Sequence, residues 1–176
     1  MKKAIYIFIF FISQYFFGQQ SNQLWKGYFS YNEIVDVESS TNAVFASTQN
    51  ALFSQVVASS NLNVYNSITG LKPDVITTIH HSDAFNKTFV GNNNGLILIQ
   101  NADGSVTTKV DVIEEVPVPP NKKRINDFFE FNGRLYIATD YGISVIDIAT
   151  SEFISTYFIG TSGEETEVLQ TTVFNN

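Results

Sequence analysis

The sequence predicts an all-β protein: a partial β-propeller of about three four-stranded antiparallel blades and the start of a fourth, preceded by a signal peptide. Three observations lead to this fold class. A motif returns at nearly constant spacing, tight-turn dipeptides recur at matching places within it, and apolar residues at helical spacing are absent after the N-terminal segment. Short apolar runs such as LILI (96–99) are typical of strands buried on both faces, as between radially packed sheets.

The motif is an 11-residue phrase with an aromatic residue first and a small residue third. It occurs as FASTQNALFSQ (45–55), FVGNNNGLILI (89–99) and YIATDYGISVI (136–146), so its first residues are 44 and 47 positions apart. Such periods indicate copies of one supersecondary unit. A β-sandwich of short strands is the alternative, but it does not explain why one phrase returns at this spacing.

Each copy has a strand candidate before the motif and another after it, which makes four strands per unit. The candidates before the motif are EIVDV (33–37), DVITTIH (74–80) and INDFFEF (125–131); those after it are LNVY (62–65), SVTTKVDV (105–112) and EFISTYF (152–158). We therefore expect blades at about 31–66, 73–112 and 124–160. The Pro-rich segment 112–124 is expected to connect two blades rather than two domains.

Turn residues separate these strands. Asn132-Gly133 and Asp103-Gly104 suit the positive-φ positions of hairpin turns, and Asn94-Gly95 and Tyr141-Gly142 fall between the second and third strands of their units. The Asn/Gly-rich break in the middle motif is therefore predicted to be a chain reversal.

Both ends suggest a longer array. Residues 166–176 contain EVLQTTVF, which resembles the first strand of a further unit, and 24–29 could close the ring or simply lead into it. Because propellers have about four to eight blades, three blades cannot close a ring. We expect the chain to be the N-terminal part of a longer protein whose remaining blades are missing here.

Residues 1–18 are predicted to be a secretory signal peptide. Lys2-Lys3 precede a nine-residue apolar run (4–12), which is too short to cross a bilayer, and cleavage is placed after Gly18. The protein is therefore expected to be exported, to the periplasm or the outer-membrane cell surface. Because the chain has no cysteine, no disulfide can form and packing alone must hold the exported domain together. The same absence argues against a lipoprotein anchor.

The charge balance argues against nucleic-acid binding. The chain of 176 residues has 10 Lys plus Arg against 17 Asp plus Glu, a net charge of −7. Loss of residues 1–18 removes two lysines, leaving eight against 17 and a net charge of −9. Such a surface repels phosphates and has no basic stripe.

No residue set predicts catalysis, a cofactor or a metal site, and no ligand-binding residue can be named. The adjacent His80 and His81 should point to opposite faces of a strand, so they cannot share a metal. Asp36 and Asp127 occupy the same repeat position, which favours a structural role. The remaining candidates are interpreted as solvated loops or weak signals: Glu114-Glu115, Glu164-Glu165 with Glu167, Asp103-Gly104, the sequon Asn86-Lys87-Thr88, and Lys122-Lys123-Arg124.

The residues also resemble a known family. WKGYFSYNEIVDV (25–37) followed by VFASTQNALF (44–53) is similar to the N-terminal propeller of PorZ-type proteins of the Bacteroidetes type IX secretion system. NSITGLKPDVITTI (66–79) and GRLYIATDYGISVID (133–147) also resemble periplasmic propellers of hybrid two-component regulators. The resemblance covers about residues 24–174.

The first resemblance implies a non-enzymatic surface protein with two propellers and a C-terminal sorting domain. Its implied partners are other secretion-machinery proteins such as a sortase, together with anionic lipopolysaccharide. The second implies a ligand-sensing propeller that continues into a transmembrane helix and a kinase. A propeller glycosidase or lyase is a third class, disfavoured because no catalytic constellation is visible.

Overall fold

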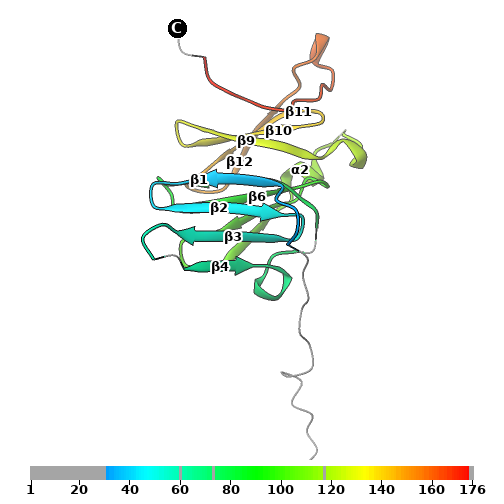
Figure 1. The fold of residues 1–176 in the computed structure, drawn as a ribbon. Coiled ribbons are helices and arrows are strands. Elements are labelled where there is room, and N and C mark those ends of the chain that lie inside the picture. Colours follow the sequence, from blue (N-terminus) through cyan, green and yellow to red (C-terminus); the bar gives the residue numbers. More distant parts are fainter. Residues whose placement is uncertain (1–30, 60, 73, 117, 175–176) are drawn as a thin grey trace, which may run out of the picture.

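The computed structural model describes residues 31–174 except 60, 73 and 117, and these residues form three four-stranded antiparallel sheets (Figure 1). In each sheet the strands are hydrogen-bonded in sequence order, from first to fourth. This up-and-down order is that of a propeller blade. It confirms the predicted fold class of three antiparallel blades and excludes the β-sandwich, which pairs strands between units.

The three blades follow one another along the chain. Blade 1 contains β1 (Asp36–Ser39), β2 (Ala43–Thr48), β3 (Ala51–Val56) and β4 (Leu62–Tyr65). Blade 2 contains β5 (Ile76–Ser82), β6 (Lys87–Asn92), β7 (Ile97–Gln100) and β8 (Val106–Lys109). Blade 3 contains β9 (Ile125–Phe131), β10 (Arg134–Thr139), β11 (Gly142–Asp147) and β12 (Phe153–Tyr157).

The predicted turns lie where the dipeptides placed them. Asn132 (φ 52°) and Gly133 (φ 72°) join β9 to β10, and both adopt the left-handed conformation of a tight hairpin. Gly95 (φ 89°) lies between β6 and β7 of blade 2, whereas Gly142 (φ 153°) is the first residue of β11 and directly follows the turn after β10 in blade 3. The Asn/Gly break in the middle motif is therefore a reversal between β6 and β7.

Two hydrophobic clusters fill the spaces between blades. One lies between blades 1 and 2 and includes Phe45, Leu52 and Leu98; the other lies between blades 2 and 3 and includes Phe89 and Leu135. Blade 2 is therefore covered on both faces, which explains its run of buried apolar residues from Leu96 to Ile99. On the outer face of blade 1, Tyr31 packs edge-on against Phe53, whereas Val37 and Val44 are 58% and 42% exposed among the described residues.

Helical turns are few and short among the described residues. They are α2 (Asp111–Glu114), η3 (Ser67–Thr69), η4 (Pro120–Lys122) and η5 (Thr161–Gly163). Both α2 and η4 lie in the connection between blades 2 and 3, which the sequence had not predicted to contain helix. None of the helices in the described part of the chain could span a bilayer.

Two details differ from expectation at the ends. The first strand starts at Asp36, so Glu33 to Val35 of EIVDV precede it. Residues 166–174 form no strand, although the N–H groups of Thr166 and Val168 donate to the carbonyls of Tyr141 and Thr139. A β-strand requires a continuous row of backbone hydrogen bonds to a neighbouring strand, and no described segment pairs with residues 166–174 along their length. The fourth blade therefore stays a prediction. The proposed signal peptide and the segment 24–29 lie outside the described residues.

Candidate functional site

The first strands of the three blades form the inner wall of the array. β5 lies against β1 on one side and against β9 on the other. In a propeller the blades surround a central channel, so side chains from these strands reach the channel side of the molecule. A side chain on β5 can therefore contact residues of blades 1 and 3 at the same time.

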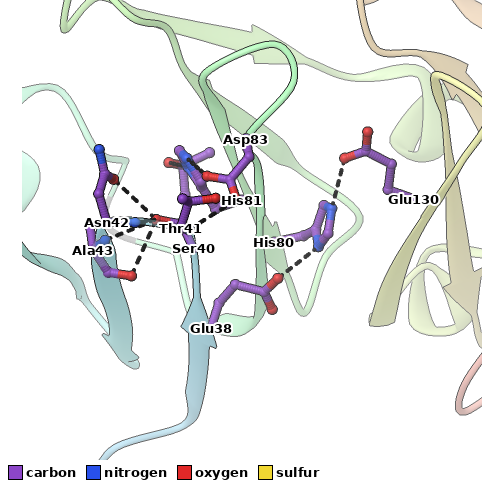
Figure 2. A network of polar contacts seen from close by, with 10 residues as sticks. Glu38, Ser40, Thr41, Asn42, Ala43, His80, His81, Asp83 and Glu130 are labelled. Carbon is purple, nitrogen blue, oxygen red and sulfur yellow. Dashed lines mark hydrogen bonds and ion pairs between the residues drawn. The ribbon is translucent and has the colours of Figure 1, made fainter.

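His80 of β5 is that side chain. Its Nδ1 lies 3.2 Å from Oε1 of Glu38 on β1, and its Nε2 lies 3.2 Å from Oε2 of Glu130 on β9 (Figure 2). The side chains are only partly accessible, with 15% of His80, 29% of Glu38 and 23% of Glu130 exposed. One imidazole therefore bridges carboxylates from both neighbouring blades.

Two opposing effects act on the pKa of His80. Burial disfavours the imidazolium and would lower the pKa, but hydrogen bonds and charge attraction from Glu38 and Glu130 outweigh it. The pKa of His80 is consequently raised above its ordinary value of 6.5. The ring is thus held in its charged form at mildly acidic pH.

His81 points to the other face of β5, as the strand alternation predicts. Its ring stacks on Phe45 with centroids 4.2 Å apart, and its Nδ1 lies 2.9 Å from Oγ1 of Thr88. Burial is the main effect here and lowers the pKa of His81, even though Asp83 lies 3.7 Å from Nε2. The pKa values of the two adjacent histidines are therefore shifted in opposite directions: that of His80 is raised and that of His81 is lowered.

A second polar contact joins the hairpin turns of blades 1 and 2. The backbone N–H and the hydroxyl of Thr41 donate to Oδ2 of Asp83 at 3.0 and 2.8 Å (Figure 2). These hydrogen bonds lower the pKa of Asp83 below its ordinary value. Within the turn between β1 and β2, the hydroxyl of Ser40 donates to the backbone carbonyl of Ala43 at 3.2 Å.

Asp36 joins the same two blades nearer the start of β1. Its Oδ2 accepts from the backbone N–H of Ile79 at 2.8 Å and from the hydroxyl of Thr78 at 3.0 Å. Asp127 in blade 3 makes the matching contact with the N–H of Thr171, at 3.4 Å. The recurrence of these aspartates thus has a structural basis: Asp36 bonds the first strand of blade 2, and Asp127 bonds the segment that follows blade 3.

A small groove opens between blades 1 and 2, with a volume of about 170 Å³. Aromatic rings of Phe45 and Tyr65 line it together with the polar side chains of Ser54, Thr88 and Gln100. Its lining includes no Lys, Arg, Asp or Glu; it does include His81, whose pKa burial lowers, so that the ring is neutral at neutral pH. The groove could therefore hold an uncharged polar group of the size of a single ring, since a cavity of about 150 Å³ can hold benzene.

Side chains of the β5–β6 hairpin reach across the interface between blades 2 and 3. Phe85 packs against the hydrophobic cluster there. The ammonium of Lys87 donates to the carbonyls of Ile148 and Ala149 at 2.7 and 2.9 Å and to the hydroxyl of Ser151 at 3.0 Å. Different side chains therefore occupy the interface between blades 1 and 2 and the interface between blades 2 and 3.

One interpretation of the basic cluster was wrong. Lys123 is not solvated but 6% exposed, and its ammonium donates to the carbonyls of Ile113 and Glu115. These carbonyls lie at the end of α2, where orphan acceptors need donors. Lys122 does lie at the surface and pairs with Glu165 at 2.7 Å, while Arg124 is exposed.

The acidic pairs are also less uniform than expected. Glu114, Glu164 and Glu167 are exposed, whereas Glu115 is partly buried and accepts from the hydroxyl of Thr156 at 2.8 Å. In the sequon, Asn86 is exposed but Thr88 is buried against His81. Among the described residues no cluster of three or more His, Asp and Glu could hold a metal.

The repeat places two of the three residues of the His80 bridge at equivalent positions. Glu38 lies opposite Phe45 in the β1–β2 ladder, and His80 lies opposite Phe89 in the β5–β6 ladder. These are the aromatic residues that open the repeated motif, so Glu38 and His80 occupy the same place in two blades. Glu130 directly follows Phe129, the ladder partner of the third aromatic residue.

A family model for the PorZ N-terminal β-propeller domain of the type IX secretion system matches residues 44–175. The chain belongs to this family. The match includes all strands of blades 2 and 3 and most of blade 1. A sequence comparison with curated proteins found no match.

Solved structures show the same fold. PorZ of Porphyromonas gingivalis, described as a surface component of the type IX secretion system, is 21% identical with a TM-score of 0.67; the match covers 76% of this chain and 18% of PorZ. The extracellular domain of a putative hybrid two-component system of B. thetaiotaomicron is 19% identical with a TM-score of 0.55, covering 70% of this chain and 16% of that one.

A third structure is an enzyme. Virginiamycin B lyase of Staphylococcus aureus is 12% identical with a TM-score of 0.59, covering 74% of this chain and 42% of the lyase. At these identities the likeness concerns the fold alone. The chain spans less than a fifth of the length of PorZ.

Proposed function

We propose that this PorZ-family propeller is a non-enzymatic surface component of the type IX secretion system. The observation that carries the proposal is the family match over residues 44–175. In this role it works beside a sortase in the attachment complex and helps to present anionic lipopolysaccharide for linkage to secreted proteins. It is exported and acts at the periplasmic or outer surface.

The charge of the chain limits how it would engage such a glycolipid. With a net charge of −7, the surface as a whole repels phosphate groups. The groove between blades 1 and 2 offers Ser54, Thr88 and Gln100 beside aromatic rings and no cation. It would therefore take an uncharged sugar of the glycan rather than its anionic groups.

Binding to purified lipopolysaccharide tests this proposal. The full-length protein is expected to bind the anionic form on a sensor surface, and Gln100→Leu should weaken that binding several-fold. Gln55→Leu is the matched control, because Gln55 is exposed on β3 and does not line the groove. Equal binding by both variants would contradict the proposal that the groove binds the glycan. Failure to co-purify with a sortase from the cell surface would contradict the secretion role.

A ligand-sensing propeller of a hybrid two-component regulator is the second candidate. The likeness to the extracellular domain from B. thetaiotaomicron favours it, as does a groove without charge. The gene sequence downstream of Asn176 distinguishes the two. A sorting domain supports the secretion role, whereas a membrane span followed by a kinase supports the sensor.

A further inference from the structure

We propose that His80 is a proton-operated latch that ties the inner strands of three consecutive blades together and releases them as pH rises. Glu38, His80 and Glu130 come from β1, β5 and β9, and the imidazole has a carboxylate 3.2 Å from each ring nitrogen. This function goes beyond the secretion role and does not depend on it.

The hydrogen-bonding capacity of the groups requires a proton at this position. An ionised carboxylate can only accept, and a neutral imidazole has one donor and one acceptor nitrogen. Only the imidazolium, with two N–H groups, can donate to Glu38 and Glu130 at once. When His80 loses its proton, one of the two carboxylates faces a nitrogen lone pair, and that contact becomes repulsive.

Among the described residues, the strands around His80 carry no basic group that could take over the role of its proton. Apart from Glu38 and Glu130, the charged groups near His80 on β1 and β9 are the carboxylates of Asp36 and Asp127. On its own strand the nearest titratable group is His81, which faces the other way; the following turn carries Asp83. β2 has no titratable residue, and the only one on β6, Lys87, donates to carbonyls of blade 3.

The direction of the pH response follows from the linkage between protonation and folding. A histidine whose folded-state pKa lies above its unfolded value contributes its full stabilisation below the unfolded value, about 6.5. That contribution is lost as pH rises through the higher folded-state pKa. The latch is therefore closed in mildly acidic surroundings and opens toward alkaline pH, at the place where three blades border the channel.

Hydrogen exchange of the full-length protein between pH 6 and pH 9 tests the latch. After correction for the intrinsic pH dependence of exchange, the amides of β1 and β9 should lose about five- to ten-fold in protection, the range of a weakened ion pair of about 1 kcal/mol. The imidazole protons of His80 should titrate with a midpoint above 6.5 by nuclear magnetic resonance.

Two variants make the test specific. The amide of Glu130→Gln can donate to a neutral imidazole and accept from an imidazolium, so protection of β9 should no longer vary with pH. Glu152→Gln, an exposed residue in the turn before β12, is the matched control and should behave like the unaltered protein. A His80 midpoint at or below 6.5, constant protection in the unaltered protein, or undiminished pH dependence in Glu130→Gln would each overturn the latch.

Discussion

Replacing Asp36 with alanine is expected to destabilise the fold by about 2–3 kcal/mol. The substitution removes an acceptor for Ile79 N–H and Thr78 Oγ1, and both donor residues are only 3% exposed. A hydrogen bond to a charged group contributes about 1.5–3 kcal/mol, and a buried donor without a partner costs about 1–3 kcal/mol. The losses from the two donors do not simply add. The Thr78 hydroxyl can rotate toward another acceptor, whereas the Ile79 N–H is fixed by the backbone and is left without a partner.

The assay is thermal and urea denaturation followed by circular dichroism. For a domain of this size, about 2–3 kcal/mol corresponds to a fall in Tm of about 4–12 °C. Asp36→Asn should lose less, because one amide oxygen can still accept from Ile79. Asp103→Asn is the matched control: Asp103 is exposed and bonds only within its own turn, so its effect should stay within about 0.5 kcal/mol. An Asp36→Ala variant as stable as the control would refute the reasoning.

Three further changes give distinct expected outcomes by the same denaturation assay. Lys123→Met should lower the free energy of unfolding by about 1–3 kcal/mol, because two carbonyls at the end of α2 lose their donor. Lys122→Met removes only a surface ion pair and should lower it by at most about 1 kcal/mol. Equal losses would contradict the role of the buried Lys123 ammonium. Gly91→Ala should lose about 1–3 kcal/mol, since its Cβ would lie 2.6 Å from Cγ2 of Ile125, and an unchanged midpoint would show that the interface can yield. Burial raises the pKa of Asp127, so the contribution of Asp127 to stability should fall as pH rises from about 3.8 through that pKa. Asp127→Asn should remove this fall and be the more stable protein at neutral pH; a less stable variant would contradict the sign.

Local sequence features predicted the blades because they act within a few residues of one another. Asn132-Gly133 determines a hairpin by backbone conformation alone, and the aromatic residues Phe45 and Phe89 mark strands that pair with their immediate neighbours. Such information is present in any short window of the chain. The number and order of strands in each blade therefore followed from spacing and turns.

Contacts between blades could not be predicted in the same way. Glu130 lies 50 residues from His80, and whether they meet depends on how far one sheet is rotated against the next. Lys123 looks like its solvated neighbours in sequence, and only the short helix α2 brings carbonyls to its ammonium. The groove likewise depends on which side chains of blades 1 and 2 meet across their interface, such as Phe45 and Gln100, and no short window of the sequence contains that information.

The polar bonds between blades join each sheet to the next one along the chain, which bears on how the protein forms. Asp36 with Ile79, Thr41 with Asp83 and Thr77 with Ile125 join residues 42 to 48 positions apart, and Lys87 with Ile148 joins residues 61 positions apart. Each sheet can therefore be secured as soon as the next one has been synthesised, without waiting for distant parts of the chain. A polypeptide that emerges vectorially from a ribosome or a translocation pore could thus assemble stepwise, and pulling on its C-terminal end should detach the blades one at a time.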